Sequence, residues 1–201
     1  MAASSSVTHL LYLHGFRSSP LSTKARQVAA RVSEQHPGVT WWCPQLPPSP
    51  RAAMALLLEG TAAWPRDRMA VMGSSLGGFY ATAVAEATGC KAVLLNPAVH
   101  AARDLAGQVG EHAGWQDPSQ RFVFEPHYVD ELRALESGAI TDPGRYFAVI
   151  AKGDEVLDWR EMTARYPGAR IRLLEGSDHA LSGFDDQIDE VFDFLDLSSR
   201  A

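Results

Sequence analysis

The chain has 201 residues, of which 46% are hydrophobic and 21% charged, an ordinary globular balance that fits one domain of residues 1–201. Its net charge of −6 and its lack of any Lys/Arg run exclude the basic surface typical of nucleic-acid-binding proteins. No apolar stretch has membrane-spanning length, and residues 1–6 lack the pattern of a signal peptide. Cys43 and Cys90 have no metal or redox spacing, so we expect reduced thiols in a cytoplasmic protein.

Strand and helix signals alternate in the first part of the chain. Residues 7–13 and 39–43 are predicted strands, and the second continues into a proline-rich connection at 44–50. The helix between them should have Ser19 as its N-cap and Pro20 at its first position. Its apolar residues recur at helical spacing: Leu21, Ala25, Val28 and Val32. A second helix is expected at about 51–64.

The third predicted strand, 69–72, ends in Gly73-Ser74-Ser75-Leu76-Gly77. This is the G-x-S-x-G pattern, which places a serine on a strained turn between a strand and a helix. The positions two before and two after the serine must lack side chains, because strand and helix approach closely there. Gly73 and Gly77 meet that need around Ser75, and a helix is expected at 76–87, before Gly89.

The second half continues the alternation less regularly. Strands are predicted at 91–95, 146–151 and 169–174, with helices at 159–166 and at about 184–195. Residues 100–145 depart from the pattern and should hold short helices at 101–108 and 127–135 and a strand at 121–124. We expect this insertion to contain any element that covers a substrate. The whole pattern predicts an α/β fold with a mostly parallel six-stranded sheet and helices on both faces.

Four polar groups follow predicted strands directly: His14, Ser75, Asp154 and His179. The carboxyl ends of parallel strands meet at one rim of a sheet, where ligands bind. Serine is a poor nucleophile without a base, and His179, in the loop before the last helix, is best placed to supply one. His14 is the rival, although its position beside Gly15 favours shaping an oxyanion loop. None of the histidines pairs at metal-ligand spacing, so no metal is expected.

A third group must orient the imidazole, and Asp154 is the first choice for this role. The chain order Ser–Asp–His is the one expected of a nucleophile elbow in an α/β sheet. Asp158, which could instead cap the next helix, and Glu155 remain alternatives. An oxyanion hole needs two fixed backbone donors. These should be the N–H groups of Leu76 and Phe16, with Arg17 as the alternative to Phe16.

Several blocks together resemble the YqiA-type bacterial esterases of the α/β-hydrolase superfamily. The blocks are residues 12–20, Gly73-Ser-Ser-Leu-Gly-Gly78, Asn96-Pro97, residues 153–158 and Ser177-Asp-His179. The resemblance spans nearly the whole chain. It implies a compact α/β-hydrolase fold and a serine esterase with Ser75 as nucleophile, Asp154 as acid and His179 as base.

Substrate contacts are expected from His14, Asn96, Tyr128 and Leu132. Tyr128, Leu132 and Leu135 share one face of the predicted helix 127–135. This face could pack in the core, or it could overhang Ser75 and line an acyl pocket.

The sequence thus predicts a serine hydrolase that cleaves carboxylic esters or thioesters through an acyl-serine intermediate, without a cofactor. An acyltransferase with the same triad and a non-catalytic binding module with this fold are the alternatives. The expected partner is a small-molecule ester or thioester, with no nucleic acid and no integral membrane segment. Monomer and dimer both remain open.

Overall fold

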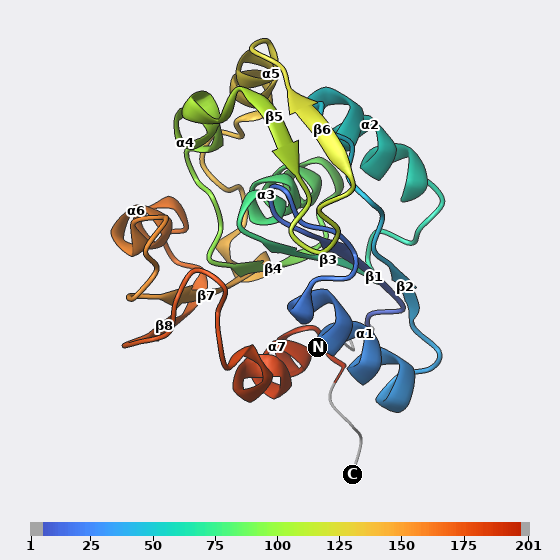
Figure 1. The fold of residues 1–201 in the computed structure, drawn as a ribbon. Helices are drawn as coiled ribbons and strands as arrows, with labels where there is room; N and C mark the ends of the chain where they lie inside the picture. The colour runs from blue at the N-terminus through green and yellow to red at the C-terminus, as the bar shows by residue number, and fades with distance from the viewer. Residues whose placement is uncertain (1–5, 198–201) are drawn as a thin grey trace.

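The computed structural model describes residues 6–197 (Figure 1). Its main sheet has six strands in the order β2-β1-β3-β4-β7-β8, and every pairing is parallel. The strands are β1 (His9–Leu13), β2 (Thr40–Trp42), β3 (Met69–Ser74), β4 (Lys91–Leu95), β7 (Tyr146–Ala151) and β8 (Arg170–Leu174). β3 and β7 are buried along their whole length, which explains why they are continuous apolar runs. The predicted parallel six-stranded sheet is confirmed.

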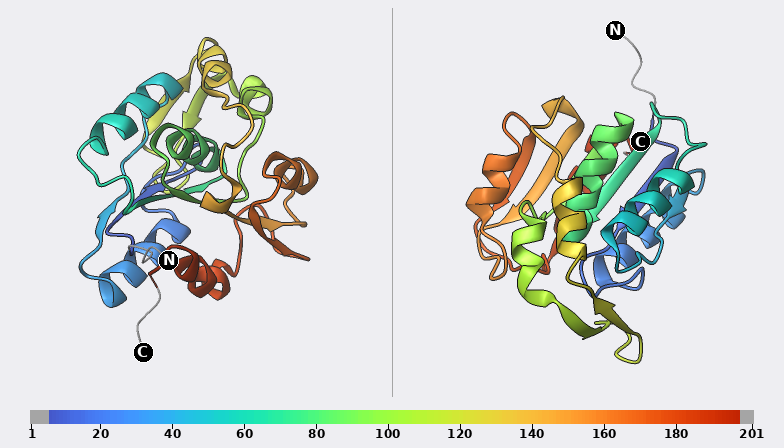
Figure 2. Two further views of the ribbon diagram at one scale, coloured as in Figure 1. Left: turned by 180° about the vertical axis from the view of Figure 1, so that it is seen from behind. Right: turned by 90° about the horizontal axis from the view of Figure 1, so that it is seen from above.

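Helices cover both faces of this sheet (Figure 2). One face packs against α1 (Thr23–Gln35) and α7 (Ile188–Phe194). The other face carries α2 (Pro50–Gly60), α3 (Leu76–Thr88), α4 (Ala101–Leu105), α5 (Tyr128–Leu135) and α6 (Trp159–Arg165). Single turns of 3₁₀-helix lie at Ala106–Gln108, Pro143–Arg145 and Phe184–Gln187. Within residues 6–197, no helix combines the length and the apolar character needed to cross a membrane.

Helix α1 begins three residues later than the sequence predicted. Ser22 precedes its first residue, whereas Ser19 lies in a separate turn. The Ser19 hydroxyl accepts a hydrogen bond from the Leu21 N–H at 3.1 Å, and its carbonyl accepts one from the Ser22 N–H at 3.1 Å. The prediction of Ser19 as N-cap is therefore wrong, because its side chain satisfies a local turn instead of a helix end.

The insertion contains a β-hairpin that the sequence revealed only in part. β5 (Gly110–Ala113) pairs antiparallel with β6 (Arg121–Phe124) to form a separate two-stranded sheet. β6 was predicted and β5 was not, since Gly-Glu-His-Ala offers little apolar alternation. The hairpin lies on the α3 side of the main sheet (Figure 1).

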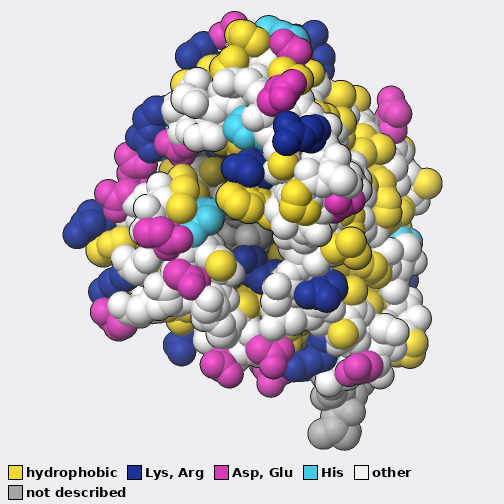
Figure 3. Space-filling model, in the orientation of Figure 1, with side chains coloured by type: hydrophobic (Ala, Val, Ile, Leu, Met, Phe, Trp, Pro, Cys, Tyr) yellow, Lys and Arg dark blue, Asp and Glu magenta, His cyan; other side chains and the backbone are white. Residues whose placement is uncertain are grey.

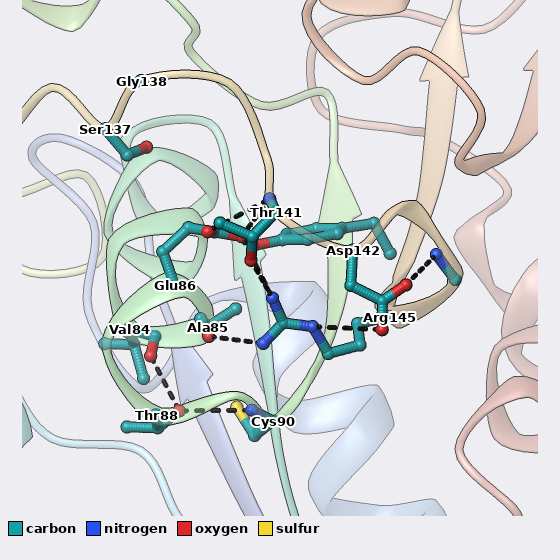
Figure 4. Close-up of polar contacts among 12 residues, drawn as sticks. Val84, Ala85, Glu86, Thr88, Cys90, Ser137, Gly138, Thr141, Asp142 and Arg145 are labelled. Atoms are coloured by element: carbon teal, nitrogen blue, oxygen red, sulfur yellow. Dashed lines mark hydrogen bonds and ion pairs between the residues drawn. The ribbon is translucent and has the colours of Figure 1, made fainter.

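The segment that leads into β7 is fastened to the end of α3 (Figure 4). The Arg145 guanidinium donates to the Ala85 carbonyl at 3.1 Å and to Thr141 Oγ1 at 2.5 Å. It also pairs with Glu86 at 3.4 Å, and Glu86 accepts a hydrogen bond from the Tyr146 hydroxyl. Carbonyls in the last turn of a helix lack intrahelical partners, so a cation there is stabilising. These contacts fix α3 at the end opposite to Ser75.

Candidate active site

Ser75 occupies a sharp turn between β3 and α3, with φ 55° and ψ −121°. Such a conformation is strained for a residue with a side chain. A Cβ on Gly73 would lie 2.1 Å from the Gly77 carbonyl oxygen, and one on Gly77 would lie 2.0 Å from the Leu13 carbonyl oxygen. The prediction that both positions exclude side chains is confirmed, and the turn presents Ser75 at the carboxyl end of the sheet.

Three polar side chains from separate loops meet at Ser75. Its Oγ lies 3.0 Å from Nε2 of His179, and Nδ1 of His179 lies 2.8 Å from Oδ2 of Asp154. Asp154 follows β7, and His179 lies in the loop after β8. The tautomer consistent with both contacts carries its proton on Nδ1, which donates to Asp154, and leaves Nε2 free to accept from the Ser75 hydroxyl.

The Asp154 carboxylate is fully buried and completely hydrogen-bonded. Its side chain has 0% exposure, and Oδ1 accepts from the N–H groups of Val156 and Leu157, each at 2.8 Å. Oδ2 is thereby left for His179. Backbone donors of this kind fix the orientation of a buried carboxylate.

The two alternative acids have other roles in the structure. Asp158 is the N-cap of α6, where its Oδ1 accepts from the Arg160 N–H at 2.8 Å. Glu155 accepts from the backbone N–H of His179 at 3.0 Å and so holds the loop instead of the ring. Asp154 is therefore the carboxylate that reaches the imidazole.

Asn96 connects the loops of His179 and Asp154 from below. It is fully buried at the end of β4, with a left-handed φ of 41°. Its Nδ2 donates to the carbonyls of Asp178 at 2.9 Å and His179 at 3.3 Å. Its Oδ1 accepts from the Ala151 N–H at 2.8 Å, at the end of β7. Asn96 was predicted to contact substrate, and that prediction is wrong, because its amide is enclosed beneath the His179 loop.

The His179 loop is also held from α1. The Lys24 ammonium donates to the Ala180 carbonyl, next to the histidine. Burial lowers the pKa of Lys24 to about 8, against the opposing attraction of Asp178 and Asp154. Asp178 accepts from the N–H of Ser182 at 2.8 Å, which closes the turn after the histidine. The imidazole is therefore fixed by contacts on several sides of its loop.

The opposite side of Ser75 is formed by the loop after β1. A Cβ on Gly15 would lie 3.2 Å from the Ser75 Cβ, so this loop passes directly beside the serine. Within residues 6–197, the backbone N–H groups of Phe16 and Leu76 have no carbonyl acceptor. Leu76 follows Ser75 in the chain, and Phe16 follows Gly15 in the loop beside the serine. Because neither N–H has a carbonyl acceptor, both are available to a ligand oxygen.

The hairpin contacts this loop through Phe16 and Arg17. The Phe16 ring makes edge-on contacts with Phe122 and Phe124, with centroids 5.7 and 5.4 Å apart. Arg17, at φ 60°, donates from Nε to the Ala113 carbonyl at 3.0 Å and accepts at its own carbonyl from the Trp115 N–H at 2.8 Å. Its guanidinium lies 3.9 Å from the Trp115 ring centroid, a cation–π contact.

A cavity of about 650 Å³ opens on this side of the serine. Its walls come from the loop after β1, the proline-rich segment, the first turns of α3 and the hairpin. Apolar lining residues include Phe16, Leu46, Leu76, Tyr80 and Phe122. Figure 3 shows the same face of the molecule, hollowed near its middle between the hairpin and α1.

His14 lines this cavity, and its ring is engaged on both edges; its contact with substrate stays a prediction. Nδ1 donates to the Gly15 carbonyl at 3.0 Å, and Nε2 accepts from the Leu46 N–H at 3.1 Å. A ring nitrogen that accepts the Leu46 N–H carries no proton, so this contact requires a neutral ring, and burial lowers the pKa of His14 in the same sense despite its bond to Gly15. The residue joins the loop after β1 to the proline-rich segment.

Tyr128 and Leu132 do not line the cavity, and their predicted substrate contact is wrong. Leu132 has 0% exposure within the core, and Tyr128 packs edge-on against Phe124 at 5.5 Å. The reason is that α5 docks on α2: Glu131 accepts from the Ser49 hydroxyl at 2.7 Å and from the Arg51 N–H at 3.0 Å. The apolar face of α5 is thus used in packing.

Two features of this site were not predicted from the sequence. The hairpin forms one wall of the cavity, and Tyr80 contributes to its floor although α3 is apolar all round and shows no preferred face. Spacing could have indicated Tyr80, since it follows Leu76 by four residues on the helix. Within residues 6–197, no cluster of three His, Cys, Asp or Glu residues could hold a metal ion.

Residues 9–196 match a family model described as "Uncharacterised protein family (UPF0227)". The chain belongs to the UPF0227 family. Its fold is shared with many solved α/β-hydrolase structures. One is the mouse α/β hydrolase domain-containing protein 10, at 16% identity, with 95% of this chain and 92% of that chain covered and a TM-score of 0.69.

Two other solved structures share this fold. Est1E from Butyrivibrio proteoclasticus with bound ferulic acid is 16% identical, covers 92% of this chain and 86% of its own, and has a TM-score of 0.70. The esterase Pf2001 from Pyrococcus furiosus is 14% identical, with 96% and 84% covered and a TM-score of 0.62. At such identities the likeness establishes the α/β-hydrolase fold of this UPF0227 protein.

Proposed function

We propose that this UPF0227 protein is a serine hydrolase that cleaves carboxylic esters, or thioesters, with Ser75 as nucleophile, His179 as base and Asp154 as acid. The observation that carries the proposal is the continuous chain of contacts from Ser75 Oγ to His179, 3.0 Å, and from His179 to Asp154, 2.8 Å. A serine hydroxyl needs a base within this reach to attack a carbonyl. The resemblance to YqiA-type esterases supports the same assignment.

In the acylation step, Nε2 of His179 accepts the Ser75 proton as Oγ attacks the substrate carbonyl. The imidazolium is stabilised by the Asp154 carboxylate, and it then protonates the departing alcohol or thiol. Water enters next, loses a proton to His179 and attacks the acyl-Ser75 ester. Collapse of that second tetrahedral intermediate releases the acid and returns the proton to Ser75.

The negative charge on the tetrahedral oxygen would be bound by the N–H groups of Leu76 and Phe16. Both are free of carbonyl acceptors within residues 6–197, and Leu76 begins α3, whose N-terminal end carries a partial positive charge. The close approach of Gly15 to Ser75 supports the placement of the Phe16 donor. The acyl group would then extend into the cavity that Phe16 and Leu76 border.

The same triad could pass the acyl group to an acceptor other than water, and the substrate's leaving group stays open between an alcohol and a thiol. The cytoplasmic location and the absence of a cofactor stay predictions from the sequence. A binding module without catalysis is disfavoured because it has no use for a buried, fully oriented Asp154–His179 pair.

A panel of p-nitrophenyl esters and acyl thioesters, assayed with the wild-type protein and Ser75→Ala, tests the proposal. Hydrolysis by the wild type should be lost in the variant, while circular dichroism and thermal unfolding stay unchanged. Equal turnover by both proteins would refute the role of Ser75. Inactivity of both towards the whole panel would favour a binding module.

A further inference from the structure

Tyr80 is the one tyrosine whose ring lines the cavity beside the proposed nucleophile. It lies on α3 and is only 2% exposed. Within residues 6–197, the Tyr80 hydroxyl makes no hydrogen bond. The Tyr12 hydroxyl also lacks a partner, but it is completely buried, whereas the Tyr80 hydroxyl is not. A buried hydroxyl without a partner is unfavourable, and one that faces a cavity can regain its hydrogen bond from a ligand.

The surroundings of Tyr80 determine which charge a ligand group beside its hydroxyl can carry. Burial, with a smaller contribution from the Glu131 carboxylate, raises the pKa of Tyr80, so its phenol stays protonated and can donate. Glu131 is itself occupied by Ser49 and Arg51. An anionic ligand group at this position would be repelled by that carboxylate, whereas a neutral oxygen would not.

The cations that line the cavity are already engaged. Arg17 donates to the Ala113 carbonyl and stacks on Trp115. Arg121, on the hairpin, lies 3.5 Å from Glu111. The lining also includes Asp117 and several Ser and Gln residues, while its apolar part comes from Leu46, Leu76 and the neighbouring prolines. This apolar part suits a hydrocarbon group, and the Tyr80 hydroxyl adds a hydrogen-bond donor to the same cavity.

The helix sets the spacing of the two residues that would bind the ester and the acyl oxygen. Leu76, whose N–H would bind the carbonyl oxygen, and Tyr80 are one turn apart, about 6 Å along the helix axis. A chain that starts at the ester carbonyl thus passes several carbon atoms before it reaches the phenol.

We infer that the site prefers acyl groups that carry a neutral oxygen acceptor, such as an ether, hydroxyl or ketone, several atoms from the ester carbonyl, and that the Tyr80 hydroxyl donates to this oxygen. This inference rests on the proposed function, because it places the acyl chain in the cavity. Tyr80 would then act as a specificity-determining residue within a pocket that otherwise binds hydrocarbon.

A scan of ether oxygens along one acyl chain tests the inference. The substrates are p-nitrophenyl octanoate and esters of the same chain length in which oxygen replaces a single methylene at successive positions. With wild-type protein, kcat/KM should show a maximum at one position of the oxygen. In Tyr80→Phe, kcat/KM for that ether ester should fall about three- to tenfold relative to kcat/KM for the octanoate ester, the range expected for one neutral hydrogen bond.

Tyr12→Phe is the matched control, since it removes an equally buried hydroxyl without a partner on the opposite face of the sheet. It should keep the wild-type profile. The Tyr80→Phe variant loses no protein hydrogen bond, so it should fold normally. An identical profile in wild type and Tyr80→Phe, or an equal loss for every ester, would overturn the inference.

A binding measurement separates this inference from the proposed function. Calorimetry with Ser75→Ala and the corresponding non-hydrolysable N-butyl amides requires no catalysis. The N-butyl amide with oxygen at the preferred position should bind three- to tenfold more tightly than N-butyl octanamide. Tyr80→Phe in the Ser75→Ala background should abolish this difference. If the wild type hydrolyses no ester but the Ser75→Ala variant shows this binding preference, the proposed function is refuted and the role of Tyr80 is kept. Equal binding of all amides, or no binding, would refute the role of Tyr80.

Discussion

The two sides of Ser75 are built from different interactions. On one side, Asp154 and His179 lie in a network where hydrogen bonds fix each polar atom, with Asn96 and Glu155 holding the histidine loop. On the other side, the loop after β1 contacts the hairpin through the packed rings of Phe16, Phe122 and Phe124, beside the hydrogen bonds of Arg17. Hydrogen bonds demand narrow geometry, whereas packed rings tolerate replacement by other shapes.

This difference suggests that the two sides carry separate properties of the proposed hydrolase. The hydrogen-bonded side would determine the rate of the chemical step, and the packed side would determine which acyl group enters. Mutations on the first side should therefore reduce turnover of all substrates alike. Mutations on the second should change the ranking of substrates.

The largest effect is expected at the carboxylate of the hydrogen-bonded side. Asp154→Asn should lower kcat by about 10⁴, because an amide at this position favours the wrong histidine tautomer. Asp158→Asn is the matched control: its amide oxygen can still accept from the Arg160 N–H at the start of α6, so both stability and kcat should stay nearly unchanged. Steady-state kinetics and urea unfolding of both variants test this prediction. A large loss of kcat in Asp158→Asn, with kcat nearly unchanged in Asp154→Asn, would assign the acid to Asp158.

A smaller but still uniform loss is expected at Asn96. Asn96→Asp keeps the acceptor for Ala151 but removes both donors to the His179 loop, so the imidazole should shift and kcat fall by about 10² for short and long acyl esters alike. Thr82→Val removes a buried hydrogen bond to Tyr166 away from the site and serves as the control. If Thr82→Val lowered kcat as much as Asn96→Asp at equal loss of stability, the positioning role would be refuted.

Leu132→Ala tests whether α5 belongs to the packed side of the site. Since Leu132 is fully buried away from the cavity, its truncation should destabilise the protein by about 2–5 kcal/mol. The ratio of rates for short and long acyl esters should stay unchanged at temperatures where the variant is folded. A changed ratio would mean that α5 contributes to the acyl pocket after all.

The smallest expected effect concerns His14. Because burial lowers its pKa in the folded protein, the unfolded chain binds the proton more readily. The stabilising contribution is complete above about pH 6.5 and is lost as the pH falls below that value towards the lowered pKa. Urea unfolding of His14→Gln between pH 5 and 8 should therefore show a shallower slope than the wild type. His36, whose pKa burial also lowers, should leave part of the slope in the variant. An unchanged slope would contradict the neutral, buried His14.

The sequence predicted the hydrogen-bonded side better than the packed side, for a physical reason. Ser75, Asp154 and His179 each follow a strand directly, so strand order alone brings them to one rim. The choice between Asp154 and Asp158 needed the structure, because both lie in one short loop. On the packed side, the apolar face of α5 was predicted correctly, but periodicity does not say which surface covers it. β5 gave no periodic signal, and the four-residue spacing of Tyr80 from Leu76 does not by itself place Tyr80 at a cavity, since both positions depend on contacts with distant segments.

In the proposed mechanism, His179 and Asp154 activate Ser75 and not its neighbour Ser74. Covalent labelling with a fluorophosphonate probe, followed by peptide mass spectrometry, distinguishes the two serines. We expect one label per chain, located on Ser75, abolished in Ser75→Ala and strongly slowed in Asp154→Asn, with Ser74→Ala labelled like the wild type. A label on Ser74, or a label that persists in Ser75→Ala, would contradict the account.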